Sequence, residues 1–368
     1  MSSQPIALLM PRSIDAVDTA WIEAVLRNAD RDVRVASVKC ARIAEGIGML
    51  STIYQVQIAY AQGDGPATVV VKLPALNEQN HGVAMTFNNY ERESLFYQHA
   101  ARLTDMRTPM AYYAANDGRS AVALVLEDMS DWMPGDQLKG STPEQTEHCI
   151  DALAQLHSSF WARVDDTAWY WIPNSTESLM SEGLHQGTIA LYDSFLAAFG
   201  VDVPQALQVN KARYIAAIPA MQRWINAAPR TLIQGDFRMD NLFFGSKPEH
   251  APVAVCDWGA SLRGKGVHDI AWLFSGSVPI ADRRANERAL IARWQQGLVA
   301  GGVNGYSVDN AWQDYRRAIL YMWTYVVVTA GSLDPNNARG RAWIGEMVKR
   351  SGQAIVDLGG VELLAEFS

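Results

Sequence analysis

Three polar residues between positions 231 and 257 have types and a spacing that suit phosphoryl transfer. Asn241 follows Asp236 at the fifth position, and Asp257 lies sixteen residues further on, after an apolar run. In enzymes that transfer phosphoryl groups, the first carboxylate accepts the proton of the attacking hydroxyl, and the amide and second carboxylate hold Mg²⁺ against the nucleotide phosphates. Magnesium prefers such oxygens and keeps part of its water shell, so two protein ligands suffice.

The same residues have an ordinary explanation, because Asp and Asn are common in loops, where they bond to their own backbone. An isolated pair of this kind therefore carries little weight, and the elements around it must support it. Thr231–Ile233 is an apolar run that leads into the polar segment, and Leu242–Phe244 resumes it. We predict strand, loop, strand, with a further strand at 253–256 that ends at Asp257.

The N-terminal third predicts one capped amphipathic helix and a set of strands. Ser13 is the expected N-cap of a helix to Leu26, and strands are expected at 33–38, 53–59, 67–73, 108–115 and 120–126. Gly46, Gly48 and Ser51 lie in a turn between two strands. They either form a plain hairpin or present backbone N–H groups to phosphates. Lys72, at a strand end, is either solvated or a partner for the α and β phosphates.

A helix is expected from about Met85 to Leu103, and it carries Glu91 and Glu93. Surface exposure is the default for both, but kinases take a lysine-fixing Glu from the first long helix after the lysine strand. We prefer Glu93 for this role, with Glu91 as the alternative. The polar, turn-rich segment 127–135 is expected to link two lobes. It either offers backbone groups to an adenine ring or is a plain linker.

From Thr142 onward the pattern predicts helices. Thr142 and Pro143 form a helix start. His157 on that helix is expected to be a hydrogen-bonded core residue. Further helices are expected at 189–199, 209–225, 270–274, 281–300, 308–331 and 340–357. The expected division is an N-terminal lobe at 1–126, a hinge at 127–135 and a helical C-terminal lobe at 136–368.

Composition limits the classes of partner. The chain has 368 residues, a net charge of −8 and no basic run, which argues against nucleic acid or an anionic membrane surface as the main partner. Its three cysteines are far apart, as expected for reduced thiols in a cytoplasmic protein. No apolar run reaches the roughly twenty residues of a membrane span, and the apolar run near the N-terminus is too short for a signal peptide core.

Taken in order, these motifs resemble the aminoglycoside phosphotransferase and choline kinase superfamily, and within it the ecdysteroid-kinase-like phosphotransferases. The resemblance covers roughly residues 21–352. It is carried by the segments 124–129 (LVLEDM), 153–161 (LAQLHSSFW), 235–242 (GDFRMDNL), 257–258 (DW) and 266–271 (GVHDIA). It implies an α+β, protein-kinase-like fold with a β-rich lobe and a mostly helical lobe, and an ATP- and Mg²⁺-dependent transfer to a small-molecule hydroxyl.

The resemblance also implies roles for single residues. Asp236 is the catalytic base, and Asn241 and Asp257 are metal ligands. The segment with Gly46, Gly48 and Ser51 would cover the nucleotide phosphates. Lys72, held by Glu93, would contact the α and β phosphates. The backbone of Glu127 and Met129 would bind the adenine ring. Asp269 would brace the catalytic loop. One departure is Gln234, which replaces the usual His; because Gln also donates and accepts hydrogen bonds, we expect slight loosening of the loop.

The acceptor is the least determined part of this interpretation. The segment 134–230 is only mildly acidic, and the helical lobe is rich in aromatic residues that could line an apolar pocket or a cage for a quaternary ammonium. We favour a fairly apolar alcohol, such as a sterol-like or hydroxyacyl compound. The alternatives are aminoglycoside or choline phosphorylation, and a nucleotide-binding pseudokinase without transfer. A protein substrate is disfavoured, because no A-P-E signature follows Asp257. The oligomeric state is not predicted.

Overall fold

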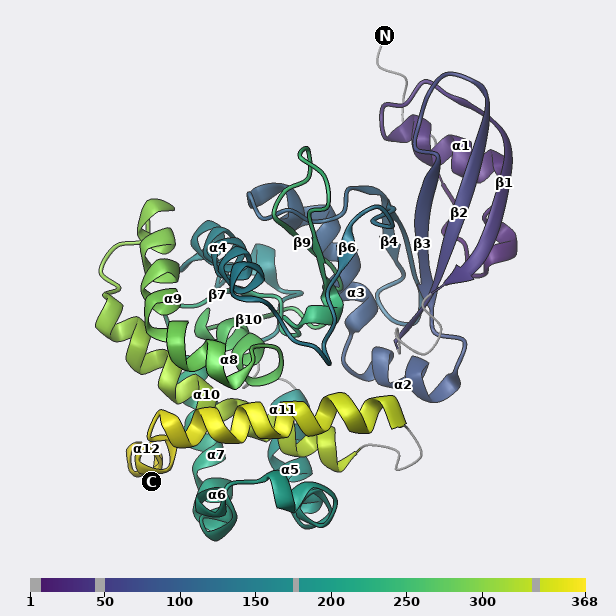
Figure 1. The fold of residues 1–368 in the computed structure, drawn as a ribbon. Coiled ribbons are helices and arrows are strands. Elements are labelled where there is room, and N and C mark those ends of the chain that lie inside the picture. Colours follow the sequence, from purple (N-terminus) through teal and green to yellow (C-terminus); the bar gives the residue numbers. More distant parts are fainter. Residues whose placement is uncertain (1–7, 44–49, 175–178, 333–337) are drawn as a thin grey trace. The chain divides into compact units, whose positions relative to one another are not determined.

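A computed structural model describes residues 8–43, 50–174, 179–332 and 338–368 (Figure 1). Of the described residues, 54% are helical and 16% lie in strands, which confirms the predicted α+β class. The chain divides into two compact units. Unit 1 contains Met1–Leu103, Thr108–Trp132 and Cys256–Ala260, and unit 2 contains Thr104–Arg107, Met133–Val255 and Ser261–Ser368. Across the described ranges, no helix has the length and apolar character needed to cross a membrane.

Unit 1 is built on an antiparallel five-stranded sheet in the order β1-β2-β3-β5-β4. The strands are β1 (Arg34–Ile43), β2 (Ser51–Gln62), β3 (Thr68–Pro74), β4 (Ala111–Asn116) and β5 (Val122–Glu127). The helix α1 (Thr19–Asn28) contacts β1 and buries Ile22, Val25 and Leu26 in the same core as the strand residues Val56, Val69 and Val71 (Figure 1). Val125 of β5 completes this core, so the lysine-bearing strand β3 is held firmly at the centre of the sheet.

The first helix begins later than predicted. Ser13 makes no side-chain cap, and residues Ile14–Ala16 form only a short 3₁₀ turn. Asp18 is the N-cap of α1, where its carboxylate accepts the Trp21 N–H at 2.8 Å. The carboxylate satisfies one of the free N–H groups at the helix start. The prediction of a cap at Ser13 was therefore wrong.

The predicted single helix from Met85 to Leu103 was also wrong. The structure has α2 (Glu78–Thr86), α3 (Asn89–Leu95), a π-helical turn (Phe96–Ala100) and a 3₁₀ turn (Ala101–Leu103). The break between α2 and α3 occurs at Asn88, whose φ of 52° lies in the left-handed region. Asn is among the few non-glycine residues that adopt this conformation, and a helix cannot continue through it.

The strands of unit 2 are short and form two small sheets. One sheet has the order β6-β8-β9, and the other pairs β10 with β7. Their bounds are β6 (Met133–Pro134), β7 (Thr231–Ile233), β8 (Leu242–Phe244), β9 (Val253–Val255) and β10 (Leu262–Gly264). The predicted strand–loop–strand arrangement is confirmed, but β7 and β8 belong to different sheets. The loop between them, 234–241, is therefore anchored at both ends by separate ladders.

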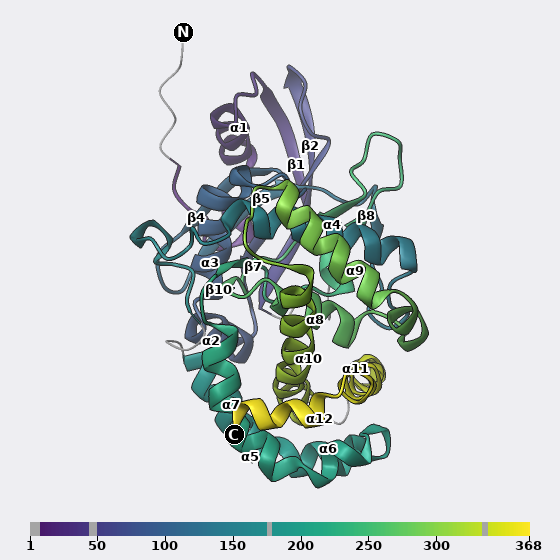
Figure 2. The ribbon, with the colours of Figure 1, turned by 90° about the vertical axis from the view of Figure 1, so that its left-hand side faces the viewer.

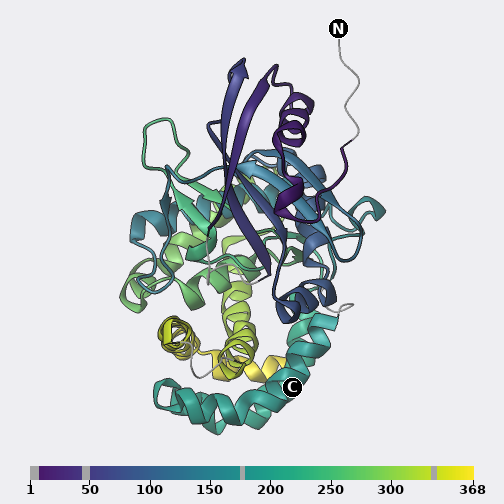
Figure 3. The ribbon, with the colours of Figure 1, turned by 90° about the vertical axis from the view of Figure 1, so that its right-hand side faces the viewer.

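The rest of unit 2 is helical. Thr142 caps α4 with Gln145 in a reciprocal capping box, as the helix start at Thr142 and Pro143 predicts. The helix α10 lies at the centre of this unit, because it contacts α5, α7, α8, α9 and α11 (Figures 2 and 3). The helices are α4 (Pro143–Phe160), α5 (Leu179–Phe199), α6 (Gln205–Val209), α7 (Lys211–Ile225), α8 (Val267–Gly276), α9 (Ile280–Ala300), α10 (Val308–Gly331), α11 (Ala338–Asp357) and α12 (Gly360–Leu363).

Candidate active site

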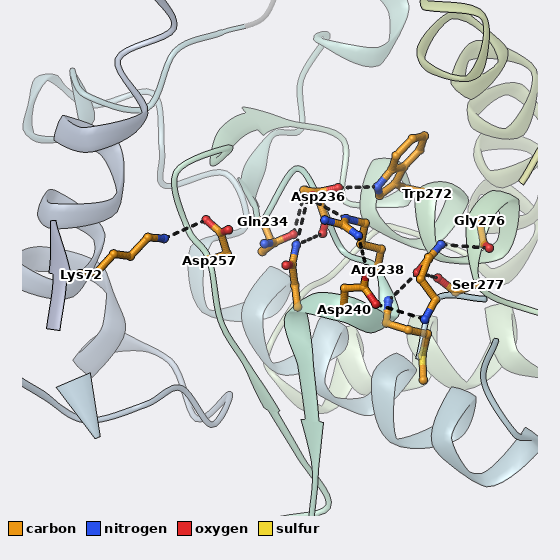
Figure 4. A network of polar contacts seen from close by, with 12 residues as sticks. Lys72, Gln234, Asp236, Arg238, Asp240, Asp257, Trp272, Gly276 and Ser277 are labelled. Atoms are coloured by element: carbon orange, nitrogen blue, oxygen red, sulfur yellow. Dashed lines mark hydrogen bonds and ion pairs between the residues drawn. The ribbon is translucent and has the colours of Figure 1, made fainter. Parts of the chain in front are cut away.

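In unit 1 the sequence-predicted residues Lys72, Glu93 and Asp257 lie together. Lys72 Nζ is 2.7 Å from Glu93 Oε2. It is 3.3 Å from Asp257 Oδ1, and Figure 4 shows this second contact. Lys72 and Glu93 are buried, with 10% and 4% of their side chains exposed, whereas the Asp257 side chain is 51% exposed. The preferred Glu93, from α3, rather than Glu91, contacts the lysine of β3.

The charges of this cluster do not cancel, since one ammonium group faces two carboxylates. Burial by itself would lower the pKa of Lys72, but Asp257 and Glu93 outweigh it and hold the pKa of Lys72 above its usual value. Burial raises the pKa of Glu93, an effect that the lysine opposes and Asp257 reinforces. Lys72 therefore stays protonated at neutral pH, and its ammonium group is shared between the buried Glu93 and the exposed Asp257.

Residues that the sequence analysis missed hold Asp257 in place. Its φ of 59° lies in the left-handed region, an uncommon conformation for a non-glycine residue that neighbouring contacts must maintain. The next residue, Trp258, is fully buried and stacks on Phe96 with ring centroids 3.6 Å apart and an angle of 5°. Asn89 Nδ2 donates to the Gly259 carbonyl at 2.9 Å. The segment 256–260 is thus tied to α3 and the turn after it.

The predicted nucleotide-binding residues are described in part. Gly46 and Gly48 lie outside the described residues. Ser51 is the first residue of β2 and pairs with Pro74 at the end of β3. The Glu127 N–H donates to the Met110 carbonyl at 2.8 Å, and the Met129 carbonyl accepts the Trp132 N–H at 3.0 Å. The backbone after β5 therefore turns away from the sheet at Met129.

In unit 2 the Asp236 carboxylate is the centre of a polar network (Figure 4). Its Oδ2 accepts hydrogen bonds from Arg238 Nε and Asn241 Nδ2, both at 3.0 Å. Its Oδ1 accepts one from Trp272 Nε1 at 3.0 Å. The side chain remains 33% exposed, so the carboxylate is held in a fixed orientation and is still accessible.

Asn241 is oriented by the same loop. Its Nδ2 donates to the Asp236 backbone carbonyl at 2.8 Å as well as to the Asp236 carboxylate. Carbonyl and carboxylate oxygens accept only, so the nitrogen must point at them, and the amide oxygen Oδ1 points elsewhere. The side chain that was predicted to be a metal ligand therefore presents the atom that a hard cation prefers.

Arg238 and Asp240, which the sequence analysis did not single out, complete the loop. Arg238 bridges Asp236 to Asp240, with its Nη1 2.8 Å from Asp240 Oδ2. Burial alone would lower the pKa of Arg238, but the two carboxylates raise it above its usual value. On the far side, Gln137 accepts the Met239 N–H and donates to the Gly276 carbonyl. Buried polar contacts thus fix the loop from two directions.

Asp269 of α8 fixes the start of the loop. Its carboxylate accepts the N–H groups of Gln234 and Gly235 at 2.7 and 2.9 Å. His157 Nδ1 accepts from the indole of Trp294, which can only donate, so His157 Nε2 carries the hydrogen that faces Asp269 at 3.3 Å. Burial would raise the pKa of Asp269, but these histidine contacts and that of His268 hold it well below its usual value.

Gln234, for which a slight loosening of the loop was predicted, takes part in the hydrogen bonding of the loop. It is fully buried, and its Oε1 accepts the Asp236 N–H at 2.8 Å. His157 is a buried, hydrogen-bonded core residue, as expected. The predicted site residues therefore form two clusters, Lys72–Glu93–Asp257 in unit 1 and Asp236–Asn241 in unit 2. Within the described part of the chain, no group of three or more His, Cys, Asp and Glu side chains has a metal-binding arrangement.

Comparisons with known proteins bear on the family and the fold of the chain. A model of the ecdysteroid kinase-like family matches residues 45–301. Acyl-CoA dehydrogenase family member 10 from Mus musculus is 38% identical over 101 residues, which are 23% of this chain and 9% of that protein's length. The chain therefore spans a small part of the curated relative that it matches.

Solved structures with the same fold span nearly the whole chain. A protein from Ralstonia eutropha JMP134, described as an aminoglycoside phosphotransferase, has a TM-score of 0.56 at 13% identity, covering 97% of this chain and 99% of that one. An aminoglycoside phosphotransferase, APH(2")-IIIa, in complex with GDP and kanamycin has a TM-score of 0.52 at 14% identity, covering 89% and 95%. Choline kinase from Cryptosporidium parvum has a TM-score of 0.51 at 8% identity, covering 90% and 93%. These likenesses confirm the kinase-like fold.

Proposed function

The chain belongs to the ecdysteroid kinase-like family of small-molecule phosphotransferases, and from that membership we propose that it transfers the γ-phosphoryl group of ATP, with Mg²⁺, to a hydroxyl group of a small molecule. The observation that carries this proposal is the Asp236–Asn241 contact, in which the Asn241 amide nitrogen is bound to both the carboxylate and the backbone carbonyl of Asp236. Two of the structural neighbours are GDP complexes, which supports nucleotide binding in this fold.

The proposed reaction has little covalent chemistry for the protein to perform. Asp236 accepts the proton of the alcohol as its oxygen attacks the γ-phosphorus and the bond to the leaving ADP oxygen breaks. Lys72, fixed by Glu93, contacts the α and β phosphates, and the backbone of Ser51, Glu127 and Met129 contributes to nucleotide binding. Catalysis then rests on positioning and on stabilisation of developing negative charge.

Asn241 and Asp257 are the proposed ligands of magnesium. The support is chemical, since one offers an amide oxygen and the other an exposed carboxylate. When bound, the ion would neutralise charge on the β and γ phosphates.

For the acceptor we favour a fairly apolar alcohol, such as a sterol-like or hydroxyacyl compound. Aromatic rings flank the catalytic loop, because Trp272 contacts Asp236 and Trp343 lies 5.7 Å from the Arg238 guanidinium. The loop carboxylates Asp236 and Asp240 are both already paired with Arg238. The Arg238 guanidinium reduces the negative charge that a polycation such as an aminoglycoside would meet there. Aminoglycosides and choline remain the alternatives.

The test compares wild type with D236N and with D193N, which alters a carboxylate that is 84% exposed on α5. ADP release is followed with Mg-ATP and a panel of apolar alcohols, hydroxyacyl compounds, choline and an aminoglycoside. We expect turnover with one apolar class, loss on the order of 10²- to 10⁴-fold in D236N, and none in D193N. Full transfer by D236N would contradict the role of Asp236. Stabilisation by Mg-ATP with no turnover on any acceptor would favour a pseudokinase.

A further inference from the structure

The hydrogen bonds to Asp236 leave an unequal number of acceptor positions on its two oxygens. A carboxylate oxygen has two lone pairs, so each oxygen accepts two well-directed hydrogen bonds. Oδ2 has two donors, Arg238 Nε and Asn241 Nδ2. Oδ1 has one donor from the described residues, Trp272 Nε1. The remaining position on the carboxylate is therefore on Oδ1, beside the indole ring of Trp272.

Trp272 is held firmly enough to define that position. Only 7% of it is exposed, and its ring lies 5.7 Å from that of Tyr325 on α10. Tyr325 in turn contacts His268, with its hydroxyl 3.3 Å from His268 Nε2. A buried indole has a donor and no acceptor, and burial without a partner for its N–H is costly, so the bond to Asp236 is strongly favoured.

The same helix also holds the backbone of the loop. Asp269 accepts the Gln234 and Gly235 N–H groups, and Trp272 follows three residues later on α8. Residues three apart lie on one face of a helix. One rigid element thus sets both the path of the catalytic loop and the direction of the carboxylate, which a contact from a separate mobile loop would not do.

Building on the proposed function, we infer that Trp272 is a positioning residue for phosphoryl transfer. It occupies one acceptor position on Oδ1 and directs the acceptor hydroxyl to the other, on the side of the Trp272 and Tyr325 rings. The hydroxyl proton passes to Oδ1, the alcohol oxygen forms the new bond to the γ-phosphorus, and the bond between that phosphorus and the ADP oxygen breaks. The carbon that bears the hydroxyl then lies beside aromatic rings, which suits an aliphatic or alicyclic alcohol.

A spectroscopic experiment tests the contact without any acceptor. In protein labelled with ¹⁵N at its tryptophan indoles, W272F identifies the Trp272 N–H resonance and W323F identifies that of Trp323. The Trp323 indole is also buried and donates to the Tyr192 hydroxyl at 3.1 Å, far from the loop along the chain. In D236N we expect the Trp272 resonance to move upfield and the Trp323 resonance to stay. An unmoved Trp272 resonance would overturn the inference.

A kinetic experiment tests whether Trp272 positions the acceptor hydroxyl. W323F is again the control, because it also removes a buried indole N–H. With the best alcohol of the panel, W272F should lower kcat on the order of 10- to 100-fold, the effect of a hydrogen bond to a charged group, and leave KM for ATP unchanged. In W272F the amount of ADP formed per molecule of phosphorylated alcohol should also rise, because water competes with the alcohol for the open position on the Asp236 carboxylate. Equal kcat in W272F and W323F would overturn the inference. If the wild-type protein phosphorylates no alcohol, the proposed function fails. The indole resonance of Trp272 in D236N then tests by itself whether Trp272 contacts Asp236.

Discussion

At the scale of single residues, Lys72 is a cation shared by two carboxylates of different exposure. The buried Glu93 depends on the lysine, because a carboxylate that loses its partner in an apolar environment has nothing to stabilise its charge. The exposed Asp257 depends on it much less, since water solvates more than half of that side chain. One lysine therefore has a structural role toward its buried partner and a weaker effect on its exposed one.

We expect K72M to lower the free energy of unfolding by about 3 to 5 kcal/mol at pH 7, because Glu93 becomes a buried charge without a partner. Burial raises the pKa of Glu93 in the folded protein above its pKa in the unfolded chain. Protonation of Glu93 therefore stabilises the folded state at a pH below the pKa of the unfolded chain, and this stabilisation is lost as the pH rises through the pKa of the folded protein. The deficit of K72M against wild type should accordingly be smaller near pH 4.

Urea unfolding at both pH values checks this expectation. K139M is the matched control, because Lys139 is 83% exposed and pairs only with the neighbouring Asp136 on the surface. Its unfolding free energy should stay within about 0.5 kcal/mol of wild type. A K72M deficit of equal size at pH 4 and pH 7 would show that Glu93 is not the group left unpaired.

At the scale of elements, α8 organises the catalytic loop. Asp269 near its start and Trp272 one turn later contact the backbone and the carboxylate of the same loop. The loop itself joins two separate small sheets, so its conformation is not imposed by a hairpin. Its rigidity depends on side chains from α8 and from the segment before α4, where Gln137 lies.

We expect D269N to destabilise the protein by about 3 kcal/mol at pH 7, because two backbone N–H groups lose a charged acceptor in a buried position. The pKa of Asp269 is held below its usual value, so its contribution is present above the unfolded pKa of about 3.9 and is lost as pH falls through the folded value. Thermal unfolding from pH 7 down to pH 3 should show wild type and D269N converging. Parallel curves for the two proteins would contradict it.

The elements also show how far the sequence could predict the structure. The spacing of apolar residues located β7, β8 and α10 at their observed bounds, because these segments are regular and have clear ends. The break at Asn88 was missed, since a left-handed residue inside an apolar pattern has no periodic signature. Lys72 and Glu93 were found through their order in the chain, whereas Trp272 and Phe96 act through contacts between distant segments that spacing alone cannot predict.

At the scale of the whole molecule, contacts distant in sequence hold unit 2 together. Arg350 of α11 is 5% exposed and donates to the backbone carbonyls of Gly276 at 2.8 Å and Leu138 at 3.1 Å. Burial lowers the pKa of this guanidinium, whose planar fork of donors reaches carbonyls in two directions. The helix α11 thus supports the segments on which Gln137 and the catalytic loop depend.

We expect R350M to lower the free energy of unfolding by about 3 kcal/mol, because buried carbonyl groups lose their donor, and R350K to recover only part of the loss. Chemical unfolding followed by circular dichroism measures both. The control is K349M, which changes the neighbouring residue, 46% exposed, and should have little effect. Equal stability of R350K and wild type would mean that a single ammonium group is enough.

The return of the segment Cys256–Ala260 to unit 1 has a consequence for biosynthesis. When the ribosome has synthesised the chain up to Trp132, all residues of the five-stranded sheet are present, but Asp257 and Trp258 have not yet been synthesised. Until Met133–Val255 has been synthesised, Phe96 has no stacking partner and Lys72 has only Glu93. A nascent chain halted at Trp132 should therefore expose an apolar surface to chaperones, and a synthetic peptide of residues 256–260 should be too short to replace the tethered segment.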